Sequence, residues 1–283
     1  MQKIEHVSDT ALMVCACRAL ENDRHDGLVR DRFASKLAGE KGMAIARSDS
    51  GFEWMCLGTG VRSRFIDDLV DELVRERGIR TVVNLGAGLD TRPWRMDLPA
   101  ALRWIEVDFP DMLNYKAARL EGEQPRCALE RIPADLSVPA DRSRVFDAAG
   151  SQPALMITEG LLMYLPRTVV NSLGAEAASK SGVRFWLFDA TSVDLMRRGH
   201  PDMMDQIDAV RAADHLSGRE IVEAVEGQGW NLVASRTYAR DSAAIALDRI
   251  TKLLSSGQVP AQRPADEDPS GVYLFSHRAN QRP

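Results

Sequence analysis

The sequence has no long apolar run, no block of basic residues and few cysteines, and each absence excludes a class of protein. No apolar stretch among its 283 residues comes close to the ~20 residues that a helix needs to cross a bilayer. Acidic residues outnumber basic ones by 41 to 36, a net charge of −5 that argues against nucleic acid as the main ligand. The N-terminus lacks a basic region followed by an apolar stretch, so we expect no secretory signal and a cytoplasmic protein.

The four cysteines, Cys15, Cys17, Cys56 and Cys127, form no paired Cys-x-x-Cys clusters. No His-x-x-x-His segment accompanies them, so we expect no metal site and interpret the cysteines as reduced thiols. What the sequence does have is an ordinary globular composition, with 45% hydrophobic and 27% charged residues. Its length allows one large α/β domain or two small ones.

The first part of the chain is predicted to be helical. Residues 8–10, Ser-Asp-Thr, offer a cap for a first helix, and a second helix is expected over residues 33–46. Apolar residues spaced by four from Val61 predict an amphipathic helix that ends at Gly78. The expected division is a helical N-terminal cap over residues 1–60 and a main domain over residues 61–283.

After Gly78, short apolar strands alternate with helices, which predicts a parallel sheet with right-handed crossovers. Residues 191–216 are polar without a clear period and are interpreted as a lid insertion. Residues 258–269 are interpreted as a solvated loop, and the closing run Val272 to Ser276 as an edge strand. The other strands are expected at 81–85, 102–107, 128–132, 154–158, 183–188 and 230–235, with helices at 110–122, after Pro166 and at 218–226.

Gly86, Ala87 and Gly88 follow the first expected strand directly. Glycine tolerates a positive φ and lets a ligand approach the backbone closely. A turn at the carboxyl end of the first strand of an open α/β sheet is a place where nucleotides bind. We therefore expect a nucleotide-like ligand at this turn, although a plain strand-to-helix turn would use the same residues.

Asp108 ends the second expected strand, 22 positions after Gly86. A carboxylate at this place can accept hydrogen bonds from both ribose hydroxyls of an adenosine. The same side chain could cap the helix that Pro110 opens, and the two roles are compatible.

A glycine turn followed by an acid suits both NAD and S-adenosylmethionine. An NAD-binding turn needs a third glycine beneath the pyrophosphate, but this sequence has Leu89-Asp90-Thr91-Arg92 there. The carboxylate of Asp90 would repel a pyrophosphate and would tolerate a cationic sulfonium. The sequence therefore favours the methyl donor.

Two more carboxylates follow later strands. Glu159 lies between apolar residues at the end of the fourth strand, where a charge without a partner is costly. We expect it to meet a cation, either the donor or a neighbouring arginine. Asp135 follows the third strand and could accept a hydrogen bond from an adenine amino group, with Leu136 covering the ring, or could cap the next turn.

These motifs together resemble the leucine carboxyl methyltransferase family, especially its bacterial branch of O-methyltransferases, which includes enzymes of polyketide pathways. The likeness covers about residues 5–200 and rests on VVNLGAGLDTRPWRM, WIEVDFPDMLNYKAARL, ADL and ITEGLLMYLP. It implies an α/β class I methyltransferase fold, with a Rossmann-like seven-stranded sheet whose last strand is antiparallel. It also implies S-adenosylmethionine as the cofactor.

Carried over by position, the resemblance implies four groups of donor contacts: Gly86 at the methionine part, Asp108 at the ribose, Asp135 with Leu136 at the adenine, and Glu159 near the amino group. Their neighbours Ala87, Gly88 and Phe109 are counted with them. The family also binds the donor's carboxylate with an arginine before the first strand. Arg62 fits this position best and Arg64 second, while Arg18 is the nearest candidate for a further basic residue from the first helix.

Methyl transfer is an in-line displacement, so placement of the nucleophile does most of the work. A carboxylate, with a pKa near ~4, needs no base, whereas a phenol, with a pKa near ~10, benefits from one. His200 and His215 lie in the expected lid and are interpreted as surface residues, so no catalytic residue is assigned.

The expected function is O-methylation of a carboxylate or hydroxyl of a small molecule, such as a polyketide-type metabolite, by a monomer or homodimer. The acceptor pocket is expected to be apolar and built from residues 1–60 and the lid. A protein C-terminal carboxyl methyltransferase is the alternative. An NAD-dependent oxidoreductase and a non-catalytic donor-binding protein are the rival functions.

Overall fold

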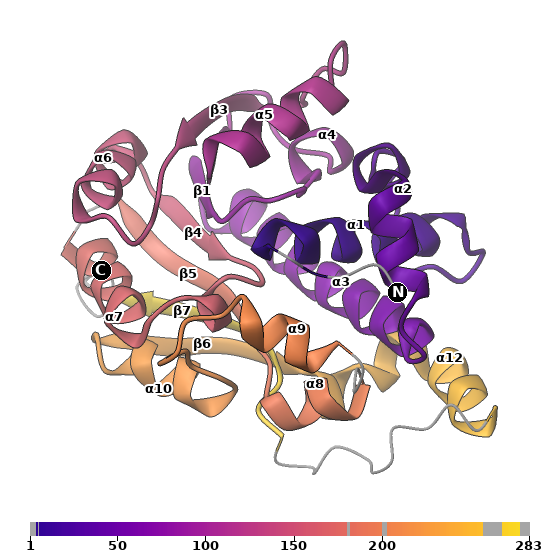
Figure 1. Cartoon of the computed structure of the whole chain (residues 1–283). Coiled ribbons are helices and arrows are strands. Elements are labelled where there is room, and N and C mark those ends of the chain that lie inside the picture. The colour runs from indigo at the N-terminus through magenta and orange to yellow at the C-terminus, as the bar shows by residue number, and fades with distance from the viewer. Residues whose placement is uncertain (1–3, 5, 180–181, 200–202, 257–267, 278–283) are drawn as a thin grey trace.

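The computed structural model describes residues 4, 6–179, 182–199, 203–256 and 268–277. Within these residues, seven strands form one sheet in the order β3-β2-β1-β4-β5-β7-β6 (Figure 1). The strands from β3 to β5 are parallel, and β7 is antiparallel to both β5 and β6. This topology confirms the predicted class I methyltransferase fold. The strands are β1 (Thr81–Leu85), β2 (Arg103–Asp108), β3 (Ala128–Pro133), β4 (Ala154–Thr158), β5 (Val183–Ala190), β6 (Trp230–Thr237) and β7 (Gly271–His277).

Helices cover both faces of the sheet (Figure 1). One face packs on α6 (Pro139–Ala149), α7 (Arg167–Ser179) and α10 (Arg219–Glu226), and the other on α3 (Phe52–Glu76) and α12 (Ala243–Ser255). The N-terminal helices α1 (Val7–Asp23) and α2 (Ala34–Arg47) pack against each other, and α1 also packs against α3. The shorter helices are α4 (Arg92–Arg95), α5 (Pro110–Arg119), η1 (Leu162–Tyr164), α8 (Val193–Gly199), α9 (Met204–Ala209) and α11 (Tyr238–Asp241).

The composition of β1 explains why it lies in the middle of the layers. All of its residues are buried. Val83 and Leu85 pack into the core under α6 and α7, whereas Val82 packs into the core under α3. A strand buried on both faces needs apolar side chains on both sides, and Val82, Val83 and Leu85 supply them.

The prediction that the closing strand lies at a sheet edge is wrong. β7 lies between β5 and β6, and its residues from Gly271 to Ser276 are buried. Its Phe275 ring packs against Phe188 of β5, with ring centroids 5.4 Å apart. The run Val-Tyr-Leu-Phe has no polar side to present to water, so it is stable with a strand on each side.

Two helix starts differ from the prediction. The N-cap of α1 is His6, whose imidazole accepts a hydrogen bond from the Ser8 N–H at 3.2 Å, so residues 8–10 lie inside the first turn. α3 begins at Phe52 rather than at Val61. It therefore runs through the position where the sequence divides the N-terminal cap from the main domain, and that division stays a prediction. α6 and α12 were not predicted.

The segment interpreted as a lid contains α8 and α9 in its described part. Met203, Met204 and Ile207 pack in one cluster with side chains of α1 and α3. The backbone N–H of Ile4 donates to Gln206 Oε1 at 2.8 Å, so the N-terminal segment meets the same region. His200 and residues 258–267 of the expected loop lie outside the described residues.

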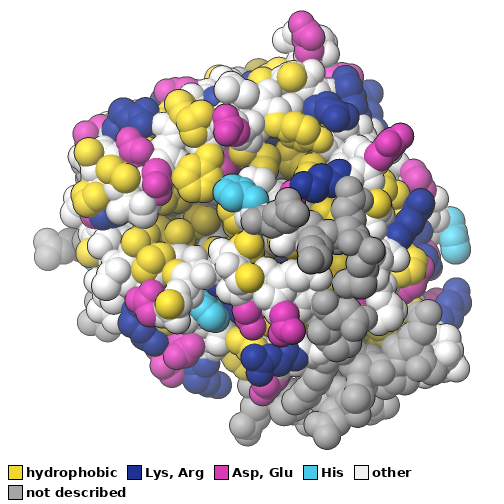
Figure 2. Space-filling model, in the orientation of Figure 1, with side chains coloured by type: hydrophobic (Ala, Val, Ile, Leu, Met, Phe, Trp, Pro, Cys, Tyr) yellow, Lys and Arg dark blue, Asp and Glu magenta, His cyan; other side chains and the backbone are white. Residues whose placement is uncertain are grey.

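Among the described helices, none has the length and apolar character required to span a membrane. On the face of the molecule in Figure 2, basic and acidic side chains are interspersed around hydrophobic ones rather than separated by sign.

Because β7 lies inside the sheet, we expect truncation of Phe275 on β7 to destabilise the protein more than truncation of its register partner Leu232 on β6. Phe275→Ala removes a fully buried ring and should lower the free energy of unfolding by about 3–5 kcal/mol. Leu232→Ala changes a side chain that is 51% exposed and should cost less than about 1 kcal/mol. Urea denaturation of both variants measures the difference, and equal effects would contradict the interior position.

Candidate active site

The carboxyl ends of the parallel strands meet at one edge of the sheet. The strand order reverses there, because β2 and β3 lie on one side of β1 while β4 and β5 lie on the other. Ligands of open α/β sheets bind at this kind of switch point. A cavity of about 930 Å³ lies at this edge. Its volume is near the upper end of the range of about 300–1,000 Å³ that is usual for ligand pockets.

The predicted glycine turn forms part of the cavity wall. Gly86 has a φ of 65° and Gly88 a φ of 45°, a region that side chains rarely adopt. A Cβ at Gly86 would also lie 2.9 Å from Cδ1 of Leu161. The backbone conformation therefore strongly favours glycine at position 86, and a side chain there would also have to displace Leu161.

Asp108 lies beside this turn and lines the cavity. Its Oδ2 accepts from the Gly88 N–H and its Oδ1 from the Phe109 N–H, both at 2.7 Å. Burial raises the pKa of the carboxyl against the effect of these two N–H groups. Each oxygen can accept a further bond. The helix-cap alternative for Asp108 is wrong, because α5 has no side-chain hydrogen bond at its N-cap.

Phe109 and Asp135 line the cavity near Asp108, and Phe109 is 42% exposed. Asp135 Oδ1 accepts from the backbone N–H of Ser137 at 2.8 Å and from its hydroxyl at 2.7 Å, so it does cap the next turn. Leu136 does not line the cavity; its side chain is buried in the core cluster that includes Phe146. The other eight predicted cofactor residues do line it.

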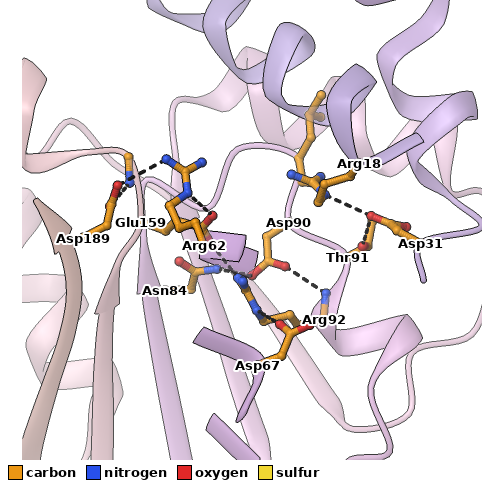
Figure 3. A network of polar contacts seen from close by, with 12 residues as sticks. Arg18, Asp31, Arg62, Asp67, Asn84, Asp90, Thr91, Arg92, Glu159 and Asp189 are labelled. Atoms are coloured by element: carbon orange, nitrogen blue, oxygen red, sulfur yellow. Dashed lines mark hydrogen bonds and ion pairs between the residues drawn. The ribbon is translucent and has the colours of Figure 1, made fainter. Parts of the chain in front are cut away.

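Glu159 lies between two arginines (Figure 3). Its Oε1 accepts from Arg62 Nε at 2.9 Å, and its Oε2 accepts from Arg92 Nη1 at 2.8 Å. The side chain of Glu159 is 14% exposed, and Arg92 is buried beneath it. Neighbouring arginines therefore supply the cation that Glu159 was expected to meet, while a direct contact with the donor stays a prediction.

Further ion pairs extend this contact into a network across α3, α4, β4 and β5. Arg62 Nη1 donates to Asp189 Oδ2 at 3.2 Å, and Arg92 Nε donates to Asp67 Oδ1 at 2.7 Å. With Asp90 and Arg95, the network has four carboxylates and three guanidinium groups, a formal charge of −1 (4 negative, 3 positive). This site is thus slightly negative in spite of its arginines.

The network sets the protonation of its acids. Burial alone would raise the pKa of Glu159, but the guanidinium groups of Arg92 and Arg62 outweigh it and hold the pKa at about 2. Burial also opposes ionisation of Asp90, yet Arg92 lowers the pKa of this carboxyl. Burial prevails at Asp189 and raises its pKa. Glu159 and Asp90 are therefore very weak bases at neutral pH.

The structure distinguishes between the basic candidates. Arg62 lines the cavity, whereas the half-exposed Arg64 pairs with Asp68 at 2.8 Å on the outer side of α3. Arg18 lines the cavity from α1. Its Nε donates to the fully buried Asp31 at 3.0 Å, and its Nη2 donates to the Leu89 carbonyl at 2.6 Å.

His215 does not line the cavity, and its Nδ1 lies 2.7 Å from the Ala212 carbonyl oxygen. Cys15, Cys17, Cys56 and Cys127 are buried free thiols. Among the described residues, no group of three or more His, Cys, Asp or Glu side chains is arranged to hold a metal ion.

Three members of the network, Asp189, Arg92 and Asp67, were not predicted from the sequence. Asp189 ends the apolar run of β5, so a lone acid at the end of a buried strand was a usable signal. Arg92 belongs to the quoted GAGLDTR motif. Asp67 had no signal, because it is one of several acids on α3 and nothing local distinguishes it.

The rest of the cavity wall is apolar. The described lining residues of α8, α9, α11 and α12 carry no charge and include Leu195, Met196, Ile207, Tyr238, Ile250 and Leu254. Arg18 and Arg62 are the charged lining residues of α1 and α3. The other charged residues in the described lining lie at the strand ends, in the turns after them and in α4. The phenols of Tyr164 and Tyr238 also line the cavity, and burial raises the pKa of both.

A sequence profile of the leucine carboxyl methyltransferase family matches residues 11–178, more than half of the chain. The chain belongs to this family, which confirms the resemblance. The matched range runs from α1 into α7 and includes every predicted cofactor residue.

Relatives in bacteria carry provisional names as S-adenosyl-L-methionine-dependent methyltransferases, which agrees with the predicted cofactor. One from Frankia alni is 38% identical over 192 residues, 63% of this chain and 67% of the relative. One from Streptomyces coelicolor is 36% identical over 183 residues, 61% of this chain and 64% of the relative. The chain thus spans about two thirds of these relatives' lengths.

The crystal structure of a DUF574 family protein from Streptomyces avermitilis has the same fold. The two structures superpose with a TM-score of 0.58 at 14% sequence identity, over 93% of this chain and 96% of that chain.

The lowered pKa of Glu159 predicts an acid-dependent contribution to stability. A carboxyl whose folded pKa is about 2 stabilises the protein fully above its unfolded pKa near 4.5 and loses this effect as the pH falls toward 2. The difference in unfolding free energy between the wild type and Glu159→Gln should therefore shrink by roughly 2 kcal/mol from pH 5 to pH 3. Urea denaturation at both pH values measures it. Glu130→Gln, at a half-exposed carboxylate, is the control.

Proposed function

We propose that this chain is an S-adenosylmethionine-dependent O-methyltransferase with a small-molecule acceptor. The observation that carries the proposal is the composition of one cavity. The glycine turn, Asp108 and part of the ion-pair network line its strand-end side, whereas the described lining residues of α8, α9, α11 and α12 carry no charge. Membership of a methyltransferase family and the names of the relatives support the donor.

The residues fit the chemistry of this donor. Asp108 has unused acceptor capacity for two ribose hydroxyls, and the exposed ring of Phe109 offers an apolar surface beside it. Arg62 and Arg18, the predicted contacts for the donor's carboxylate, both line the cavity. The network of charge −1 complements a ligand that carries a sulfonium, an ammonium and one carboxylate, a net charge of +1.

When bound, the donor supplies a methyl group on sulfur; the acceptor oxygen forms the new C–O bond as the C–S bond breaks and sulfur keeps the electron pair. The protonation states of the chain's residues determine whether they can take a proton from the acceptor. Glu159 and Asp90 are held ionised by arginines, and the raised pKa values of Tyr164 and Tyr238 keep both phenols protonated. The phenols can thus donate hydrogen bonds but accept no proton.

The described lining residues include no histidine, and Glu159 and Asp90 are held ionised, which suits an acceptor that is already ionised. A carboxylate has lost its proton at neutral pH, whereas a phenol or alcohol would have to release one during transfer. We therefore favour a carboxylate acceptor on an apolar small molecule, with a methyl ester as the product. The carboxyl terminus of a protein is the alternative, which the family name supports.

The donor assignment predicts a loss of affinity in Asp108→Ala. Removing hydrogen bonds to a charged acceptor costs about 1.5–3 kcal/mol each at most, so S-adenosylhomocysteine should bind at least tenfold more weakly. Isothermal titration calorimetry measures this change. Asp111→Asn, at an exposed acid of α5, is the matched control and should bind as the wild type does. Unchanged affinity of Asp108→Ala for S-adenosylhomocysteine would contradict the proposal. So would a wild type that releases heat on titration with NAD and none with S-adenosylhomocysteine.

The acceptor assignment predicts the fate of a radiolabelled methyl group. Incubation of the enzyme with labelled donor and a cell extract should place label in the organic phase. Mild alkali should release that label as methanol, because it cleaves a methyl ester and leaves an ether intact. Label on a protein band would favour the protein carboxyl alternative, and alkali-stable label would identify a hydroxyl acceptor.

A further inference from the structure

A buried ion pair joins α1 to α12. The Glu21 carboxylate accepts from both terminal nitrogens of Arg249, each at 2.7 Å. The side chains are 0% and 4% exposed, respectively. Oε2 of Glu21 also accepts from the backbone N–H of Leu28 at 3.1 Å. Both carboxylate oxygens are thus bonded inside the protein.

The same carboxylate lies against α3. A Cβ at Gly60 would be 2.8 Å from Oε2 of Glu21, so this position of α3 has room for the carboxylate because it is glycine. One side chain therefore contacts α1, α3, the segment after α1 and α12. Burying an ion pair costs desolvation energy and is weak evidence for stability. Its clearest effect here is to fix the position of α12.

α12 is part of the cavity wall, together with the short helix α11 before it. Ala243, Ile250 and Leu254 of α12 line the cavity, as do Tyr238 and Ser242. None of these side chains is charged, and they come from a part of the chain that the sequence analysis did not assign to the acceptor pocket. The charged lining residues belong to α1, α3 and the strand-end side.

We propose that α12, held in place by Glu21 and Arg249, determines which acceptors the enzyme takes, by receiving the uncharged, apolar body of the acceptor. The proposal rests on the function proposed above and adds the wall that selects the substrate. Ala243, Ile250 and Leu254 are specificity residues in this view, and Arg249 is a positioning residue. Acceptors with a charge on the part that lies against α12 are excluded.

The test uses 8-anilinonaphthalene-1-sulfonate as a probe, since it combines an apolar aromatic body with one anionic group. Its fluorescence is titrated with the full chain saturated with S-adenosylhomocysteine. Ala243→Asp should weaken probe binding by about tenfold or more, because an apolar body then meets a charge. Ala243 is exposed in the cavity wall, so the variant should fold. Calorimetry should give unchanged affinity for S-adenosylhomocysteine.

Leu247→Asp is the matched control. It makes the same charge change one turn further along α12, at a side chain that is 60% exposed and does not line the cavity. It should leave both affinities unchanged. Arg249→Lys keeps the charge but loses the two-nitrogen contact with Glu21. It should therefore weaken binding of the probe and leave the affinity for S-adenosylhomocysteine unchanged.

Equal probe affinity in Ala243→Asp and the wild type would overturn the role of α12. The role of α12 would also be overturned if Leu247→Asp lost as much probe affinity as Ala243→Asp. The same holds if Ala243→Asp lost affinity for S-adenosylhomocysteine together with affinity for the probe. Failure of the proposed function gives a different result, since the wild type would then bind no S-adenosylhomocysteine. If Arg249→Lys does not fold, the comparison of Ala243→Asp with Leu247→Asp still decides the question.

Discussion

The pairing of Glu159 with Arg62 and Arg92 is the interaction on which the site depends. A carboxylate that is 14% exposed at the end of a buried strand needs cations close by, because an unpaired charge there is costly. The two arginines come from α3 and α4, so meeting this need fixes both helices against the end of β4. Asp67, Asp90 and Asp189 in turn neutralise the arginines. The result is a rigid floor with a small negative charge.

The position of this charged floor explains why charged and apolar lining residues occupy different parts of one cavity. Parallel strands bring their carboxyl ends to a single edge, so acids that follow them gather there without any further device. The helices that complete the wall come from outside the parallel strands, and their inward sides belong to packed apolar clusters. A charged donor and the apolar acceptor proposed above can therefore share about 930 Å³ without conflict.

Local pattern was enough to predict β1, β4, the glycine turn and the acid at position 108, because each depends on residues close together in sequence. It failed where partners are distant. Nothing near Val272 shows that β7 enters between β5 and β6, and the ion pair of Arg62 with Asp189 joins residues 127 positions apart. The cap by His6 was missed because serine, aspartate and threonine are commoner caps. Leu136 was placed on the ligand side, although its side chain faces the core.

α3 connects the two halves of the cavity. Within eight positions it presents Gly60 to the Glu21 carboxylate, Arg62 to Glu159 and Asp67 to Arg92. The contact that fixes α12 and the contacts that form the charged floor thus share one rigid helix of 25 residues. A shift of α3 along its axis would disturb both halves together, whereas a change on α12 alone leaves the charged floor intact. If the acceptor lies against α12 as proposed, α12 is therefore the place to look for substitutions that alter acceptor choice without affecting the donor.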